Sequence, residues 1–315
     1  MKAAVYGRSG VVIEEIEKPT PADDEVLIKI RAASINAPDW RLLSASPLVR
    51  RLMFAIGKRK VARPGSDVAG VVEAVGKNVT QFKPGDAVFG CCRGSFAEYG
   101  CGLESYLVAK PDGLTFEQAA CVAVAGLTAL QGLRDKAKVQ RGEKVLINGG
   151  SGAVGTFAVQ IAKSLGAEVT VVCSPGNLEM VRSIGADRVI DYTKEDFVAE
   201  PQRYDVLFDI AGNRSLSDCR RVLSADGRFV MVGGPKNAWG VASRALSAFL
   251  FSRVSRRFIM FIARLRKDDL IVLADLMKSG KVTPVIDRRY ALGDVAQALQ
   301  YVSGGHARAK VVITP

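Results

Sequence analysis

Hydrophobic positions in the first third of the chain recur in short segments that turns interrupt. β-branched residues and alternation predict strands at residues 2–6, 11–16, 25–33, 68–75 and 87–89. Turn sequences such as Pro84-Gly85-Asp86 separate them. Many short strands with few helices favour a small, partly open β-barrel over residues 1 to about 120.

From about Phe116 the apolar segments alternate between strand length and helix length. Strands are predicted at 144–148, 168–173, 188–190, 206–210 and 228–232. Helices are predicted at 153–165 and 178–184, with helix-length segments at 194–200 and 213–223. Such alternation indicates a parallel sheet covered on both faces. Beyond residue 267, helices at 270–278 and 292–302 and a closing strand at 310–314 are expected to rejoin the first domain.

Bulk composition is that of a globular protein with about two domains. The chain has 315 residues, of which 48% are hydrophobic and 24% charged. Six cysteines show no C-x-x-C pair, so we expect reduced, mostly buried thiols. The N-terminus enters a strand pattern at once, without a signal-peptide pattern, and arginines interrupt the most apolar run, residues 239–260. A cytoplasmic location follows as an expectation.

The net charge of +12 is concentrated in two segments. Residues 41–63 hold seven Lys or Arg and no acid, and residues 236–267 hold eight and no acid. Such segments could attract phosphates, an anionic substrate or a lipid surface, or could simply be solvated faces. They lack a recognised nucleic-acid module, so nucleic-acid binding is not expected.

A glycine-rich loop at Gly149 to Gly155 follows a predicted strand and opens a predicted helix. Gly150, Gly152 and Gly155 have G-x-G-x-x-G spacing. In this context the first glycine permits a tight turn, the second admits a pyrophosphate, and the third lets helix and strand pack closely. The N–H groups at the helix start, over Ser151, Ala153 and Val154, are expected to hold the phosphates. The loop predicts a bound dinucleotide.

The second strand of this unit ends in Cys173-Ser174-Pro175-Gly176-Asn177, which contains no acid. Folds that prefer NAD place a carboxylate there to accept from the ribose 2′-OH. Ser174 and Asn177 can instead donate to a 2′-phosphate, and Tyr192 lies just past the third strand. We therefore predict NADPH, with a charge partner such as Arg182 or Lys194.

The chain resembles the zinc-independent, quinone-oxidoreductase type of the medium-chain dehydrogenase/reductases, close to the reticulon-interacting-protein branch. The resemblance covers essentially the whole chain. The segments that carry it are 64–72, 83–90, 95–99, 125–129, the glycine-rich loop, 185–192 and 305–308. It implies an α/β protein with a GroES-like β-barrel domain at 1–121 and 267–315, a doubly wound Rossmann domain at 122–266, and a cleft between them.

Relatives that bind catalytic zinc carry a Cys just after the strand that ends here at Ser34, and a His-Glu pair where Ser66-Asp67 stand. Both positions differ in this chain, and its one histidine is His306. Catalytic zinc takes about three protein ligands, so we expect no metal. Without a Lewis acid, a hydride from NADPH is expected to go to an acceptor that is already electrophilic, a quinone or an enone.

Family resemblance also implies roles for single residues. Asn36 would face the nicotinamide and donate a hydrogen bond to the developing oxyanion, or would merely cap a loop. Thr128 would contact the carboxamide of the nicotinamide or would cap a helix. The corner of His306, Ala307 and Arg308 would line the cofactor cleft or form a surface turn. Asp39 is expected to be structural, and Tyr99 to lie in the core.

Two other functions stay open. An NADP-linked alcohol or aldehyde dehydrogenase is disfavoured by the missing metal ligands and by the lack of a Tyr-x-x-x-Lys relay. A non-catalytic NADPH-binding sensor would keep the same loop. Aromatic residues within 236–267 are typical of a dimer contact or of an interfacial surface, and we expect a homodimer before a peripheral membrane contact.

Overall fold

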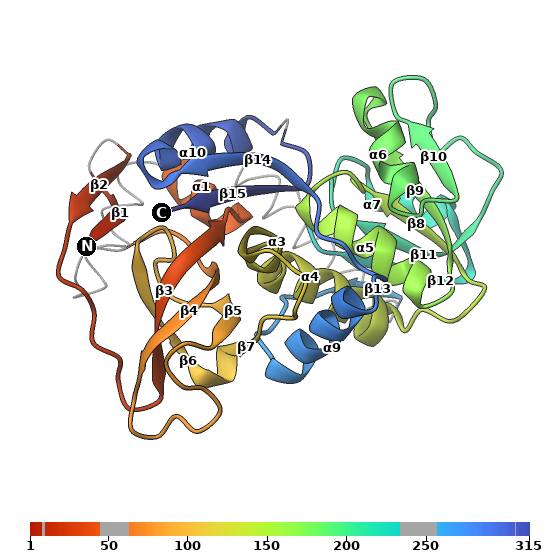
Figure 1. The fold of residues 1–315 in the computed structure, drawn as a ribbon. Coiled ribbons are helices and arrows are strands. Elements are labelled where there is room, and N and C mark those ends of the chain that lie inside the picture. The colour runs from red at the N-terminus through yellow and green to blue at the C-terminus, as the bar shows by residue number, and fades with distance from the viewer. Residues whose placement is uncertain (8–9, 45–62, 234–256, 306) are drawn as a thin grey trace. The chain divides into compact units, whose positions relative to one another are not determined.

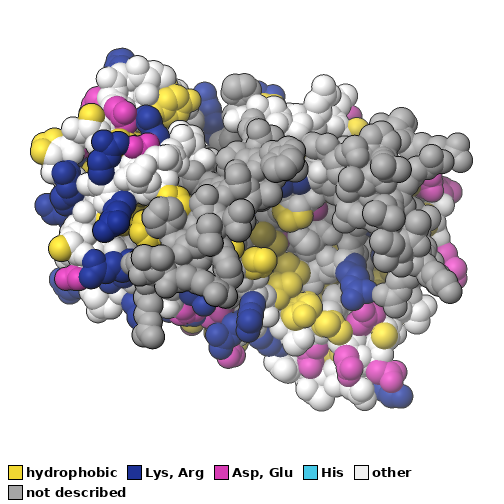
Figure 2. All heavy atoms as spheres, turned by 180° about the vertical axis from the view of Figure 1, so that it is seen from behind, with side chains coloured by type: hydrophobic (Ala, Val, Ile, Leu, Met, Phe, Trp, Pro, Cys, Tyr) yellow, Lys and Arg dark blue, Asp and Glu magenta, His cyan; other side chains and the backbone are white. Residues whose placement is uncertain are grey.

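The computed structural model describes the chain except at residues 8–9, 45–62, 234–256 and 306. It contains two compact units (Figure 1). The first comprises Met1–Ala125, Leu265–Lys278 and Pro284–Pro315, and the second comprises Gly126–Arg264 and Ser279–Thr283. Most of the basic segments 41–63 and 236–267 lies outside the described residues. Figure 2 shows described Lys and Arg side chains at several separate places on the face that it draws.

A mostly antiparallel sheet forms the first unit, in the order β14-β15-β3-β4-β5-β7, with β6 also pairing with β3. Its strands are β3 (Glu25–Ser34), β4 (Asp67–Val75), β5 (Ala87–Cys91), β6 (Tyr99–Leu103), β7 (Leu107–Ala109), β14 (Ile286–Ala291) and β15 (Lys310–Thr314). A separate hairpin joins β1 (Lys2–Tyr6) to β2 (Val11–Glu15).

Strand β3 organises this unit because three strands pair with it. β4 pairs along its whole length, whereas β6 pairs with its first half and β15 with its end. Apolar side chains of β3 at Val26, Ile28 and Ile30 pack in a core cluster with β4 and β5, while Lys29 and Arg31 point outward, as alternation along a strand requires. The pairing brings the end of β3 beside the first residues of β4 and β15, where the polar residues described below lie.

Four helices accompany the described part of this sheet: α1 (Ala37–Ser44), α3 (Phe116–Ala120), α9 (Lys267–Lys278) and α10 (Val295–Gly304). Helix α3 begins with a capping box between Thr115 and Gln118. Helix α10 ends at Gly305, whose φ of 79° is the left-handed conformation that glycine adopts readily.

Six parallel strands form the sheet of the second unit, in the order β10-β9-β8-β11-β12-β13. They are β8 (Lys144–Asn148), β9 (Glu168–Cys173), β10 (Arg188–Asp191), β11 (Tyr204–Asp209), β12 (Leu223–Met231) and β13 (Phe258–Met260). The order reverses between β8 and β11, which is the position where doubly wound sheets bind ligands. The predicted α/β fold with a Rossmann sheet is confirmed.

Both faces of this sheet are buried. Val145, Leu146 and Ile147 follow one another in β8 and point alternately to the two faces, yet each is 0% exposed. Helix α5 (Ala153–Ser164) packs on β8 and β9, and α7 (Leu216–Arg221) packs on β12. A shorter helix, α6 (Leu178–Ser183), packs on β10.

One predicted element of the second unit is wrong. The helix-length segment 194–200 forms turns. The Asp191 carboxylate accepts from the backbone N–H and the hydroxyl of Thr193, and the Asp196 carboxylate accepts from the Val198 N–H. Aspartate side chains that bind the backbone two residues on compete with helix hydrogen bonds. In the described part of the chain, no helix is long and apolar enough to cross a membrane.

Candidate active site

The glycine-rich loop of the second unit links β8 to α5. Gly149 has φ of +91°, so the chain turns there in a conformation that glycine favours. An added Cβ at Gly150 would lie 2.3 Å from Val171 Cγ1, and one at Gly155 would lie 2.4 Å from the Gly149 carbonyl oxygen. A Cβ on Gly152 would instead meet only the Gly149 oxygen at 3.6 Å. The loop is thus tight against the sheet at Gly150 and Gly155 and open at Gly152.

Helix α5 begins with no side-chain hydrogen bond at its N-cap, Gly152. The N–H groups of its first turn, from Ala153 and Val154 onward, have no partner within the helix. Such groups and the helix dipole favour a negatively charged ligand such as a pyrophosphate. Loop and helix start therefore fit the phosphates of a dinucleotide.

The end of β9 holds the residues predicted to face the ribose. Asn177 Nδ2 lies 3.1 Å from Ser151 Oγ and 2.9 Å from Ser174 Oγ and donates to both. Because each serine oxygen accepts from the amide, each serine hydroxyl can donate to a ligand. Because Nδ2 already donates to both serines, Asn177 has no donor left for a 2′-phosphate, contrary to the expectation from the sequence. Its Oδ1 is buried and has no partner among the described residues, which is unusual for a buried acceptor and fits a donor on a ligand, such as a hydroxyl group.

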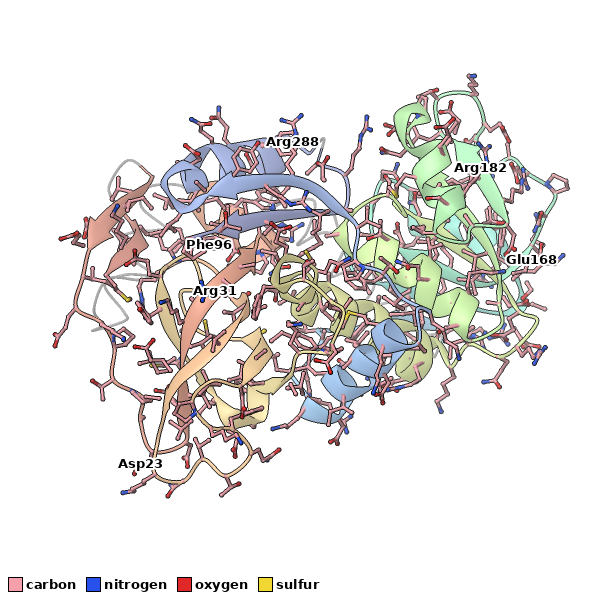
Figure 3. The ribbon with its side chains drawn as sticks, viewed as in Figure 1. Asp23, Arg31, Phe96, Glu168, Arg182 and Arg288 are labelled. Carbon is pink, nitrogen blue, oxygen red and sulfur yellow. The ribbon has the colours of Figure 1, made fainter. Side chains whose placement is uncertain are left out.

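Tyr192 and Arg182 lie near the same strand end. Tyr192 is 54% exposed, and its backbone N–H donates to the Cys173 carbonyl oxygen. Arg182 lies on α6, labelled in Figure 3, and its charge acts to lower the pKa of Cys173 against the dominant effect of burial, which raises that pKa to about 11. The Asp191 carboxylate, paired beside Cys173 at the end of β10, has a larger effect than Arg182 and raises the same pKa, so a negative and a positive charge both lie within electrostatic reach of the β9 end.

Thr128 does not cap a helix, because it lies inside α4 (Ala123–Leu130). Its capping alternative is therefore excluded, and its side chain is half-buried. Asp209, at the end of β11, was not predicted. Its buried carboxylate accepts from Asn148 Nδ2 and from the Gly212 N–H, which ties β8 to β11 where the strand order reverses.

In the first unit, a buried polar cluster forms where β3, β4 and β15 meet. Lys310 is 0% exposed, and its Nζ lies 2.8 Å from Asn36 Oδ1, 3.1 Å from Asp67 Oδ2 and 3.3 Å from the Ile35 carbonyl oxygen. Asp67 is also 0% exposed and accepts from the Val124 N–H, with the Ser34 hydroxyl at 3.0 Å. A buried ion pair needs such complete hydrogen bonding.

Asn36 is 6% exposed and has its two amide atoms in different surroundings. Oδ1 accepts from Lys310, whereas Nδ2 lies 3.5 Å from Ser66 Oγ, the long limit of a hydrogen bond. The turn after Asn36 is capped by Asp39, whose Oδ2 accepts from the Asn36 backbone N–H at 2.7 Å. The Asn36 side chain is therefore not the cap of its own loop.

Asp39 also binds a second segment, because its Oδ1 accepts from the Gly65 N–H at 3.1 Å. Burial raises the pKa of Asp39 from 3.8 to about 6, against the two backbone hydrogen bonds that lower it. The carboxyl holds the Asn36 turn against the residues that precede β4, as the structural interpretation of Asp39 requires.

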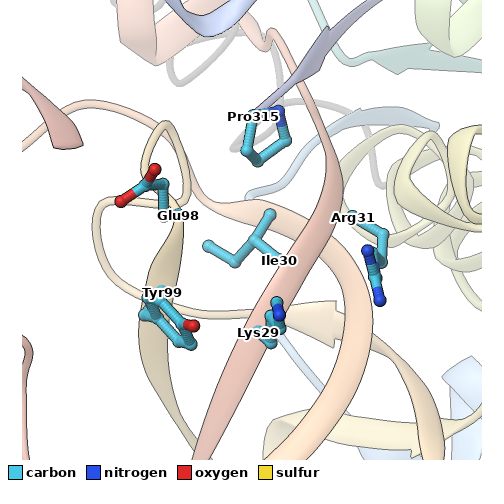
Figure 4. A pocket seen from close by; sticks show the side chains of 6 residues that line it. All are labelled: Lys29, Ile30, Arg31, Glu98, Tyr99 and Pro315. Atoms are coloured by element: carbon cyan, nitrogen blue, oxygen red, sulfur yellow. The ribbon is translucent and has the colours of Figure 1, made fainter. Parts of the chain in front are cut away.

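Beyond Ser66 lies a hollow of about 910 Å³. Its lining includes Gly65, Ser66 and the basic residues Lys18, Arg63 and Arg93. A second hollow of about 390 Å³, shown in Figure 4, is lined by Lys29, Ile30, Arg31, Glu98, Tyr99 and Pro315 and contains no predicted site residue. Tyr99, expected in the core, is half-buried there, with Lys18 Nζ 4.0 Å from its ring centroid.

The predicted corner at residues 306–308 is described only in part, because His306 lies outside the described residues. Ala307 packs against the core cluster of β1, β15 and α10. Arg308 is exposed, and its backbone N–H donates to Asp287 Oδ2 at 2.9 Å.

Within the described ranges, no three His, Cys, Asp or Glu side chains are grouped as metal ligands. Burial raises the pKa of Cys92 to about 12 and that of Cys101 to about 11, so both thiols are protonated at neutral pH.

Sequence reasoning missed Lys310, the residue that joins Asn36 to Asp67. The one signal was a lysine at the head of the apolar strand Lys310–Thr314. A lysine at a strand end is ordinarily solvated, and its partners are 243 and 274 residues away along the chain.

Comparison with known proteins identifies the family. Models of an alcohol dehydrogenase GroES-like domain and of a zinc-binding dehydrogenase match residues 22–112 and 184–313. A chloroplast envelope quinone oxidoreductase homolog of Arabidopsis thaliana is 31% identical over 325 residues, covering 98% of this chain and 95% of its own. A chloroplastic NADPH-dependent alkenal/one oxidoreductase of the same plant is 33% identical over 334 residues, covering 100% of this chain and 80% of its own.

A solved structure of the quinone oxidoreductase from Coxiella burnetii has a TM-score of 0.86 and 28% identity, and the match covers 100% of this chain and 99% of that one. The predicted GroES-like and Rossmann domains are thus confirmed. The chain belongs to the medium-chain dehydrogenase/reductases of the quinone oxidoreductase-like type, with an NAD(P)H-binding Rossmann domain.

Proposed function

We propose that this protein is an NADPH-dependent reductase that delivers a hydride, without a metal, to a quinone or an α,β-unsaturated carbonyl. The observation that carries the proposal is the buried amide of Asn36, whose oxygen is bound by Lys310 and whose nitrogen lies toward Ser66. Ser66 lines the 910 Å³ hollow. The relatives named for quinones and for alkenals or enones support the same acceptor class.

In this proposal, NADPH supplies the hydride when bound. The loop from Gly150 to Val154 binds the pyrophosphate through backbone N–H groups. The Ser174 hydroxyl, held by Asn177 Nδ2, donates to the 2′-phosphate, with Tyr192 and Arg182 near it. Asn36 Nδ2 donates a hydrogen bond to the acceptor oxygen, on which negative charge develops as the hydride arrives. We retain Thr128 and the His306, Ala307 and Arg308 corner as proposed cofactor contacts.

The proposal that no metal takes part is supported by the side chains that surround Asn36. The carboxylate of this cluster, Asp67, is already bound by the Lys310 ammonium and by the Val124 N–H. A fixed positive charge 3.1 Å from the carboxylate opposes a second cation there.

Further parts of the proposal concern the whole protein. We propose that residues 1–121 and 267–315 form the GroES-like domain and that residues 122–266 form the Rossmann domain. We also propose that the protein is a homodimer and that it is related to the reticulon-interacting-protein branch of the family. A cytoplasmic location stays a prediction, because relatives include chloroplast proteins.

The test is NADPH oxidation with a panel of quinones and enones, using wild type and Asn36→Asp. Aspartate keeps the bond to Lys310 but has no N–H donor, so kcat should fall about 100-fold while the Kd for NADPH is unchanged. Asn78→Asp, an exposed change in the same unit, is the control.

Three results would count against the proposal. Wild type that binds NADPH but reduces no acceptor would indicate a sensor, and turnover of alcohols with NADP⁺ would indicate a dehydrogenase. Wild-type kcat in Asn36→Asp would remove the amide from the mechanism.

A further inference from the structure

We propose that Lys310 is a positioning residue that holds the Asn36 amide with its nitrogen toward the acceptor and strengthens that nitrogen as a hydrogen-bond donor. This inference rests on the proposed function. Its basis is the buried contact of Lys310 Nζ with Asn36 Oδ1 at 2.8 Å.

The chemistry of lysine decides which way the amide points. The oxygen and nitrogen of an asparagine side chain have nearly the same shape, so either could face a given neighbour. An ammonium has three donors and no acceptor, so Lys310 can bind the amide oxygen but not the nitrogen. Asn36 Nδ2 must then lie on the other side, which is the side of Ser66.

Lys310 is itself held by its three acceptors. One proton goes to Asp67, one to the Ile35 carbonyl oxygen and one to Asn36, so three buried acceptors match its three donors. Turning the amide would place its N–H₂ against the ammonium and leave one buried donor of Lys310 unpaired. An unpaired buried charge of this kind is costly, so the arrangement resists rotation.

The charge of Lys310 also acts through the amide. A cation bound at Oδ1 draws electron density from the nitrogen, and hydrogen bonds in series strengthen one another in a low-dielectric interior. Asn36 Nδ2 therefore becomes a better donor toward an oxygen that is gaining negative charge. Lys310 contributes without touching the acceptor.

A competing explanation is that Lys310 serves only to neutralise the buried carboxylate of Asp67. The double variant Lys310→Met/Asp67→Asn separates the two, because it removes both charges of the pair together. If neutralisation were the whole role, this variant would regain wild-type kcat. Under our proposal its kcat stays about 10- to 100-fold low, with the Kd for NADPH unchanged.

A thermodynamic cycle with Asn36 gives the sharper readout. Adding Asn36→Asp to the double variant should lower kcat little further, because both changes remove the same oriented donor. If the fold-losses in kcat caused by Asn36→Asp and by the double variant multiply when the changes are combined, the proposal is overturned. Wild-type kcat in the double variant would also overturn it. Lys77→Met, which removes a lysine from an exposed ion pair with Asp23, is the matched control.

A measurement on the wild-type protein tests the inference if the variants do not fold or if no acceptor is turned over. With ¹⁵N-labelled asparagine, the chain's six side-chain amides can be observed by NMR, and the Asn36 signal is the one missing in Asn36→Asp. An Nδ2 order parameter near the rigid value of about 0.85 is expected. A value below about 0.6 would show a free amide and overturn the role of Lys310, whereas loss of all turnover with a rigid amide would count against the proposed function alone.

Discussion

Asp39 shows how one buried carboxyl can control a loop. Its two oxygens accept from the backbone N–H groups of Asn36 and Gly65, and it is 7% exposed. Burial raises its pKa to about 6, with the Asp67 carboxylate acting in the same direction and the Lys310 charge against it. The native state therefore retains a proton on Asp39 at pH values where the unfolded chain has lost it.

The sign of the resulting pH dependence follows from linkage. Below about pH 4, Asp39 is protonated in both states. Between about pH 4 and 6 only the native state holds the proton, so the contribution of Asp39 to the free energy of unfolding falls as pH rises. The fall is on the order of 3 kcal/mol at most.

We expect wild type to lose this stability relative to Asp39→Asn between pH 4 and 6.5. Urea unfolding at several pH values measures the difference between the two proteins, which cancels the other titrating groups. Asp23→Asn, at an exposed ion pair, should show no such trend. A pH-independent difference for Asp39→Asn would contradict the assignment.

At the scale of elements, the proposed preference for NADPH depends on the end of β9. Asn177 donates to Ser151 and Ser174, which turns both hydroxyl groups into donors for a ligand. Neither the C-terminal end of this strand nor the turn after it contributes an acid, since Val-Val-Cys173 is followed by Ser-Pro-Gly-Asn. A carboxylate at this point would repel the 2′-phosphate of NADPH and would accept a hydrogen bond from the ribose 2′-OH of NADH.

Ser174→Asp should therefore reverse the preference. We expect the Kd for NADPH to rise at least about tenfold, which corresponds to about 1.4 kcal/mol, while the Kd for NADH falls. Titration of cofactor fluorescence measures both constants. Ser217→Asp, an exposed serine in the first turn of α7, is the control. Unchanged preference would mean that the end of β9 does not contact the 2′ position.

For the whole molecule, the net charge of +12 governs encounter with anions. A positive protein attracts anionic reactants over distances that salt screens, about 10 Å at 0.1 M ionic strength. The hollow beside Ser66 adds the local basic residues Lys18, Arg63 and Arg93.

With NADPH saturating, kcat/KM for a sulfonated naphthoquinone should fall several-fold between 20 and 300 mM salt. The uncharged parent naphthoquinone is the matched comparison and should change little. Steady-state rates at five salt concentrations measure both slopes. Equal slopes for the two acceptors would show that the charge does not steer them.

The sequence by itself determined the elements that local pattern controls. The apolar run from Val145 to Ile147 predicts a buried strand, and the spacing of Gly150, Gly152 and Gly155 predicts a tight turn into a helix, because periodicity and glycine geometry act over a few residues. The same local reasoning failed at 194–200, where Asp191 and Asp196 bind the backbone and form turns.

Only the tertiary structure decided what surrounds Asn36. Lys310 and Asp67 lie 274 and 31 positions from it, and they meet because β3 pairs with both β4 and β15. Asp39, three residues away, accepts the hydrogen bond that caps the turn, so the Asn36 side chain is not needed as the cap. Strand pairing and burial set these contacts, and the spacing of residues along the chain carries no record of them.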